Sequence, residues 1–174
     1  MTTAAKSRVF LAFGGNLEDP RNAFTGAIRK LQQHPRIELT AASSLYRTPP
    51  TGGPTGQPDY LNAVVELATD LPANELLAFC HEIEDAAGRT RNIRWEARTL
   101  DLDLLFYDQL VQNSAGLCLP HPRLQQRHFV LLPLAELAAD FRHPILQQTV
   151  AEMLTLLPPA AGISRLPDEW IDHD

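Results

Sequence analysis

The chain has 174 residues, a formal net charge of −6 and an ordinary composition, with 44% hydrophobic and 21% charged residues. This length suits a single domain with a core that needs no disulfides, so we expect one domain over residues 1–174 with a loosely held tail from about residue 158. The acidic balance argues against a nucleic-acid surface. The two cysteines, Cys80 and Cys118, form no zinc motif, and no long apolar run indicates a leader or membrane span. These observations favour a reduced, cytoplasmic setting, and we also expect a monomer.

The N-terminal third predicts a strand followed by a helix. Val9 to Phe13 is a short apolar run, and it ends at the breaker cluster Gly14-Gly15-Asn16, which is typical of a turn. Asp19-Pro20 has the N-cap and N1 order of a helix start, and Pro35 ends that helix.

A long connection separates the next two strand patterns. Ile37 to Tyr46 is predicted to form one strand, and Tyr60 to Thr69 another. Between them, Arg47 to Asp59 holds four prolines and three glycines in thirteen residues, which indicates a functional or disordered loop. Pro72 begins a second helix, and Gly88 has the position of a glycine just beyond a helix end.

The stretch from Arg98 to Phe106 has the period-2 pattern of a strand with one face in the core. The core face would carry Leu100, Leu102, Leu104 and Phe106. Asp101 and Asp103 then share the other face, with Cα atoms roughly 6–7 Å apart. Such a pair can hold one or two hard cations together with water and substrate phosphates. The alternative is a half-buried strand whose other face is merely solvated.

The order of these elements is strand-helix-strand-strand-helix-strand, the split βαβ arrangement of ferredoxin-like proteins. The fold class we expect is therefore α+β, with a βαββαβ core and an antiparallel sheet. Leu110-Val111 and Leu117 to Leu119 predict a small hairpin. Helical patterns at Phe129 to Ala138 and Val150 to Leu157 would cover part of the second face of the sheet.

Four arginines lie in the ten residues before the aspartate strand, namely Arg89, Arg91, Arg94 and Arg98. A mobile segment there could bring guanidinium groups onto phosphates held by cations, or the segment could be an exposed loop kept soluble by its charge. Trp95 in the same segment either covers a planar ring or anchors the loop to the core.

Other polar residues have two interpretations each. Glu84 and His81 lie on the flank of the second helix, where they either face the same cleft or are solvated. His121 stands between two prolines, as a ligand contact or as part of a turn. Tyr60 and Asn62 share one face of their strand beside the long loop, where an amide can bind a heterocycle edge.

Six short motifs follow one another along the chain, at residues 13–17, 44–50, 57–63, 83–91, 98–103 and 120–129. The most specific are Arg98-Thr99-Leu100-Asp101-Leu102-Asp103 and Pro120-His121-Pro122-Arg123. In this order they resemble the 6-hydroxymethyl-7,8-dihydropterin pyrophosphokinase family, over nearly the whole chain. The resemblance implies transfer of a diphosphate from ATP to a pterin alcohol, with release of AMP, in folate biosynthesis.

The resemblance also implies a set of site residues. Asp101 and Asp103 would ligate two Mg²⁺ ions and, with Arg89 and Arg98, would be the catalytic residues. The pterin pocket would comprise Thr48, Pro50, Tyr60, Asn62 and Phe129. The site for ATP, the co-substrate, would comprise Glu84, Arg91, Arg98, His121, Arg127 and Trp95. The partners implied are small molecules, with no nucleic acid and no membrane.

Two alternatives remain open from the sequence. One is a non-catalytic pterin or nucleotide-binding paralogue that has kept the fold. The other is an ordinary kinase that moves a single phosphoryl group, which only its products would distinguish.

Overall fold

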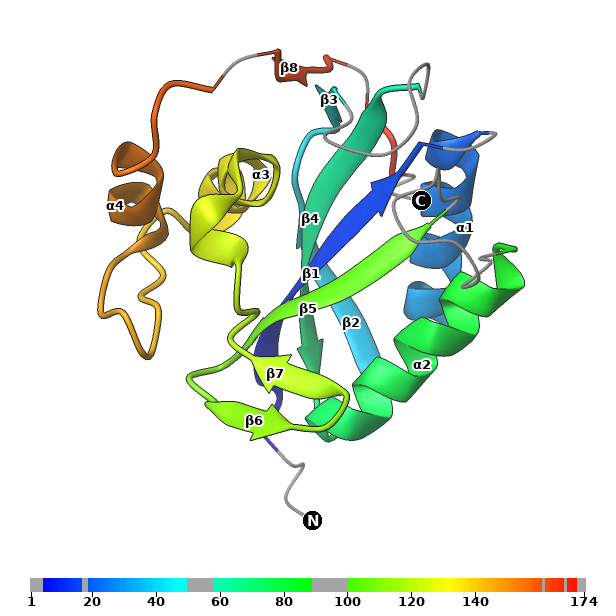
Figure 1. Cartoon of the computed structure of the whole chain (residues 1–174). Coiled ribbons are helices and arrows are strands. Elements are labelled where there is room, and N and C mark those ends of the chain that lie inside the picture. Colours follow the sequence, from blue (N-terminus) through cyan, green and yellow to red (C-terminus); the bar gives the residue numbers. More distant parts are fainter. Residues whose placement is uncertain are drawn as a thin grey trace.

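Figure 1 shows the computed structural model of the chain, in which residues 5–16, 19–49, 58–88, 100–160, 162–167 and 169–171 are described. Within them, a six-stranded sheet runs through the centre in the order β5-β1-β4-β3-β8, with β2 also paired to β4. Its strands are β1 (Ser7–Gly15), β2 (Ile37–Ala42), β3 (Tyr46–Thr48), β4 (Tyr60–Thr69), β5 (Asp101–Tyr107) and β8 (Ser164–Arg165). Every pairing in it is antiparallel.

Helices cover both faces of the sheet (Figure 1). On one side lie α1 (Pro20–Gln33) and α2 (Ala73–Ala86), and on the other α3 (His128–Ala138) and α4 (Val150–Thr155). A separate hairpin of β6 (Gln112–Ser114) and β7 (Leu117–Leu119) and a short 3₁₀ helix at Leu124–Gln126 connect β5 to α3. The order β1-α1-β2-β4-α2-β5 with antiparallel pairing confirms the predicted ferredoxin-like α+β core. No helix in the described part of the chain is long and apolar enough to cross a membrane.

Two hydrophobic cores follow from this layering. Val9, Leu11 and Phe13 of β1 pack toward α1 and α2, whereas Phe10 and Ala12 pack toward α3 and α4. A strand covered on both faces is apolar throughout, which explains the unbroken apolar run of β1. The prediction that the later helices shield the second face is confirmed.

The local signals for the first two helices are also confirmed. Asp19 caps α1 by accepting a hydrogen bond from the backbone N–H of Asn22 at 3.1 Å. After α2, Gly88 adopts a φ of 87°, the left-handed conformation in which glycine is favoured at a helix end.

The predicted single strand over residues 37–46 is wrong, since β2 ends at Ala42 and β3 begins at Tyr46. The pairing of β2 with β4 shifts register between Leu39 and Ala41. After β2, the Val64 N–H of β4 donates to the side-chain hydroxyl of Ser43 at 2.9 Å, where a regular strand would offer a backbone carbonyl. Because both segments pair with β4, the two short strands together line one of its edges.

Gly14-Gly15 was predicted to be a turn, but both glycines belong to β1. Gly14 lies directly opposite Asn62 of β4 and Asp101 of β5. A Cβ atom on Gly14 would lie 3.4 Å from the Asn62 side-chain oxygen, so the Asn62 amide lies beside the space that the glycine leaves open.

The predicted alternation of the aspartate strand holds as far as Leu104. Beyond it, a register shift against β1 makes Leu105 and Phe106 both pack in the second core. Phe106 therefore does not share a face with Leu102 and Leu104, contrary to the prediction. A bulge adds one residue to a strand, and every later side chain changes face.

Two expectations about the C-terminal part need correction. The hairpin exists, but Leu110 and Val111 are exposed and precede its first strand. The tail predicted to be loosely held from about residue 158 is anchored where it is described. There β8 pairs with β3, and Trp170, only 6% exposed, packs edge-on against Phe13 and Phe24.

Candidate active site

One row of residues crosses the sheet from edge to edge. The strand register sets these residues opposite one another in the order Arg165, Tyr46, Asn62, Gly14 and Asp101. Opposed residues point to the same face, here the face that carries the core beneath α3. Neighbouring strands are about 4.8 Å apart, so Asn62 and Asp101 stand roughly 10 Å from each other. Only Gly14, which has no side chain, lies between them.

The two aspartates share this face, as predicted. Asp103 is exposed and lies opposite Ala12, while Asp101 is half-buried. Their neighbours on β1 are thus the two smallest residue types, which leaves room for a ligand. No cluster of three or more potential metal ligands occurs among the described residues. Two carboxylates alone suit Mg²⁺, which keeps several waters and takes further oxygens from a substrate phosphate.

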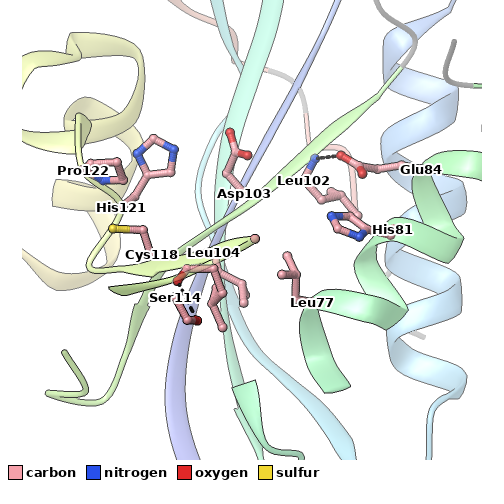
Figure 2. A pocket seen from close by; sticks show the side chains of 12 residues that line it. Leu77, His81, Glu84, Leu102, Asp103, Leu104, Ser114, Cys118, His121 and Pro122 are labelled. Atoms are coloured by element: carbon pink, nitrogen blue, oxygen red, sulfur yellow. Dashed lines mark hydrogen bonds between the residues drawn. The ribbon is translucent and has the colours of Figure 1, made fainter. Parts of the chain in front are cut away.

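A cavity of about 390 Å³ lies beside Asp103, between α2 and the β6–β7 hairpin (Figure 2). It is lined by Leu77, His81, Glu84, Leu102, Asp103, Leu104, Ser114, Gly116, Leu117, Cys118, His121 and Pro122. In Figure 2, Asp103 stands between His121 on one side and His81 and Glu84 on the other. The structure therefore brings Glu84, His121 and Asp103 together around one cavity.

Glu84 is buried, with 2% of its surface exposed. Its Oε2 atom accepts a hydrogen bond from the backbone N–H of Leu102 at 2.8 Å (Figure 2). Leu102 lies between the two aspartates on β5, an edge strand of the described sheet. Glu84 thus fixes α2 to the strand that carries both carboxylates, and it is not merely solvated.

His121 is held from two directions. Its backbone N–H donates to the Leu105 carbonyl at 3.0 Å, and its Nδ1 accepts from the Arg123 N–H at 3.3 Å. Burial lowers the pKa of His121, and Arg127 and Arg123 lower it further, against the opposing charge of Asp103. A neutral imidazole whose Nδ1 accepts carries its proton on Nε2. It can therefore donate to an anionic oxygen.

Three of the predicted ring-binding residues, Thr48, Tyr60 and Asn62, lie side by side on β3 and β4, across Gly14 from Asp101. We call the part of the row from Asn62 to Arg165 the ring end, and the part at Asp101 the carboxylate end. Asn62 is 6% exposed, and its Nδ2 donates to the Thr48 hydroxyl at 2.7 Å. Tyr60 lies opposite Thr48 in the register. Phe129 lies in the first turn of α3, half-buried against the second core, and the guanidinium carbon of Arg127 is 5.5 Å from its ring centroid.

Five predicted site residues lie outside the described residues: Pro50, Arg89, Arg91, Trp95 and Arg98. The sequence reasoning also missed residues that the structure places at the site. Asn16, 2% exposed, donates from Nδ2 to the Pro58 carbonyl at 3.0 Å and so ties the end of β1 to the start of β4. Gly14, between Asn62 and Asp101, was also missed. The signal that could have found it is a glycine inside a strand pattern, since such a glycine often marks a place where a ligand or another chain segment comes close to the backbone.

Relatives of known name match nearly the whole chain. A protein of Pseudomonas aeruginosa is 41% identical over 160 residues, covering 92% of this chain and 97% of its own length. A protein of Methylorubrum extorquens is also 41% identical over 160 residues, covering 92% of this chain and 99% of the relative. Both bear the name 2-amino-4-hydroxy-6-hydroxymethyldihydropteridine pyrophosphokinase.

Solved structures agree in fold. The Plasmodium falciparum HPPK-DHPS wild type with pteroate superposes with a TM-score of 0.66 at 12% identity, covering 90% of this chain and 43% of that one. This chain thus spans less than half of that longer protein. Residues 10–139 match the family described as 7,8-dihydro-6-hydroxymethylpterin-pyrophosphokinase. The chain belongs to the 7,8-dihydro-6-hydroxymethylpterin-pyrophosphokinase family.

Proposed function

We propose that the chain transfers the diphosphate of ATP to the hydroxymethyl group of 6-hydroxymethyl-7,8-dihydropterin and releases AMP. The chain is a pyrophosphokinase, a transferase of folate biosynthesis. The observation that supports the detailed reaction best is the row in which Asn62 and Asp101 flank Gly14. A ring bound at one end would place a short alcohol arm toward the carboxylate end.

At the carboxylate end, Asp101 and Asp103 would hold two Mg²⁺ ions. Bound ions there would offset the negative charge of the triphosphate and polarise the phosphoryl group under attack. His121 would donate its Nε2–H to a phosphate oxygen. The arginines Arg89, Arg91, Arg98 and Arg127 would add bidentate contacts to the phosphates, with Trp95 covering the adenine side.

Glu84 acts at this end through the backbone. Its bond to the Leu102 N–H keeps β5 in place against α2, so we assign it a positioning role beside ATP. The two aspartates are then held on a strand fixed on both sides, by β1 in the sheet and by α2 at the edge.

At the ring end, Asn62 would read the edge of the pterin with donor and acceptor groups, while Thr48 holds its amide in one orientation. Tyr60, Pro50 and Phe129 would supply apolar surface for the ring. Little covalent chemistry is required of the protein. Holding the alcohol in line with the β-phosphorus and stabilising the charge would supply most of the acceleration.

We further propose that the chain works as a single-domain monomer in the cytoplasm on small-molecule substrates. The acidic net charge supports small-molecule substrates over nucleic acid, and two cysteines in no zinc or disulfide pattern support a reducing compartment. The non-catalytic alternative has no support from the relatives, whose names denote a pyrophosphokinase.

The direct test is to incubate the purified protein with ATP, Mg²⁺ and the pterin alcohol and to identify the products. We expect AMP, formed in step with pterin diphosphate. ADP as the sole nucleotide product would show an ordinary kinase instead. Binding of the alcohol without turnover would favour the non-catalytic paralogue.

A further inference from the structure

The C-terminal segment, defined as residues 162–167 and 169–171, bonds to the β2–β3 connection and to α1. Trp170 donates from its indole nitrogen to the Ser43 carbonyl at 2.8 Å. The backbone N–H of Leu166 donates to the Leu45 carbonyl at 2.8 Å. The Glu169 carbonyl accepts from Arg21 of α1 at 2.7 Å. The segment is therefore held by the pairing of β8 with β3 and by three hydrogen bonds just after β8.

The same segment continues the row toward the ring site. Arg165 lies opposite Tyr46, which lies opposite Asn62. The strand between them, β3, has three residues and carries Thr48, the acceptor of the Asn62 amide. A three-residue strand held by one neighbour is weakly restrained, so pairing with β8 on its second edge fixes its register.

Glu136 of α3 joins these parts through one carboxylate. Its Oε1 accepts the Tyr46 hydroxyl, and its Oε2 accepts the backbone N–H of Ser44 at 3.0 Å and the Ser44 hydroxyl at 3.2 Å. The Arg165 guanidinium lies 3.7 Å from Oε1 and donates to the Ser44 hydroxyl at 2.9 Å. Burial and the bond to Glu136 both raise the pKa of Tyr46, so its hydroxyl stays protonated and donates.

We propose that Arg165, Tyr46 and Glu136 are positioning residues for the ring site, through which the C-terminal segment holds β3 and thereby Thr48 and Asn62. None of the three needs to touch the substrate. The inference rests on the proposed function, because that function places the pterin at Asn62. It predicts that changing these residues weakens binding of the alcohol substrate and leaves ATP binding unchanged. Asp101 and the cavity beside Asp103 lie at the opposite edge of the sheet.

The test uses the full-length protein with Arg165→Ala, Tyr46→Phe and Glu136→Ala, each checked for cooperative thermal unfolding. For Glu136→Ala we expect the KM for the pterin alcohol to rise about tenfold, and for the other two several-fold, as for the loss of one or two charge-assisted hydrogen bonds. The KM for ATP and the dissociation constant of α,β-methylene ATP should stay within about twofold.

Two further variants separate positioning from general destabilisation. Glu136→Gln keeps an acceptor for the Tyr46 hydroxyl and should recover most of the lost affinity. Arg36→Ala is the matched control, because it removes another exposed arginine ion pair, to Asp70 at 2.8 Å, beyond the far end of β4. It should change neither KM. If Glu136→Ala does not fold, the exposed Arg165 decides the question.

An equal loss of pterin and ATP affinity, or unchanged affinities in all three variants, would overturn the proposal. A wild-type protein that neither binds nor converts the pterin alcohol would overturn the proposed function and this inference together. Wild-type turnover with unaffected variants would overturn the inference alone.

Discussion

The two ends of the row across the sheet differ in how completely the protein satisfies its own polar groups. At the ring end, the Asn62 amide is buried and bonded to Thr48, and behind it Tyr46 and Glu136 bond to each other. At the carboxylate end, Asp103 is exposed beside a cavity of about 390 Å³.

This difference separates binding from chemistry. Preorganised hydrogen bonds at the ring end would orient a planar heterocycle without a later ordering cost. A carboxylate pair that water reaches can hold a hydrated cation, and the cation can then exchange waters for phosphate oxygens. Substitutions at the ring end should therefore affect affinity and stability together, whereas those of Asp101 and Asp103 should affect turnover and leave stability nearly intact.

The largest effect is expected for Asp101→Asn and Asp103→Asn. Each keeps the side-chain shape but removes a charge that we propose holds Mg²⁺, so turnover should fall by at least about a hundredfold. The KM for the pterin alcohol should change little, because Asn62 lies about 10 Å away. AMP release measures turnover, and Asp140→Asn, an exposed carboxylate on the surface, is the control. Near-normal turnover in either variant at ordinary Mg²⁺ would refute the metal-ligand assignment.

Asn62→Ala, at the ring end, should weaken pterin binding and lower stability. It removes the group that we propose reads the ring, and it leaves the buried Thr48 hydroxyl without its donor. We expect the pterin KM to rise at least about tenfold and the free energy of unfolding to fall by about 1–3 kcal/mol. Steady-state kinetics and urea denaturation measure the two quantities. An ATP affinity that dropped as far as the pterin affinity would contradict the separation of the ends.

Glu84→Ala tests whether the carboxylate strand is positioned by α2. The variant leaves the Leu102 N–H without its acceptor in a buried place, which should cost about 1–3 kcal/mol of unfolding free energy. Turnover should also fall, since β5 carries both aspartates. Glu84→Gln retains an acceptor oxygen and should lose less of both. Glu82→Ala, exposed on the same helix, should leave stability and turnover unchanged; a loss as large as that of Glu84→Ala would indicate a general helix effect.

The smallest effect concerns His143, a buried residue away from both ends. Its Nδ1 accepts the backbone N–H groups of Ile145 at 3.1 Å and Leu146 at 3.0 Å, and burial lowers its pKa below the ordinary 6.5. The unfolded chain therefore takes up the proton first, and the free energy of unfolding should fall as the pH drops below about 6.5.

His143→Asn keeps an oxygen acceptor for both N–H groups and removes the titrating ring. The decline in stability below pH about 6.5 should be shallower in this variant than in the wild type. Thermal unfolding midpoints at several pH values measure it. Parallel curves for the two proteins would mean that other groups dominate the acid transition.

Local signals in the sequence were enough to predict several elements. The bounds of β4, the capped start of α1 at Asp19 and the glycine end of α2 were all confirmed. The shared face of Asp101 and Asp103 was also predicted correctly. Each of these features depends on side-chain periodicity or on groups within four residues of one another, so the chain determines them before it folds.

Contacts between distant segments decided the rest. Glu84 is buried because β5, 18 residues later, presents an N–H to it, and Trp170 is anchored by Ser43, 127 residues earlier. The bulge that points Phe106 into the second core is a feature of the pairing between β5 and β1. No periodicity encodes such partners, because a hydrogen bond or register shift depends on where the other strand or helix lies. The sequence thus determined which groups are available for the site, and the tertiary structure decided which of them meet.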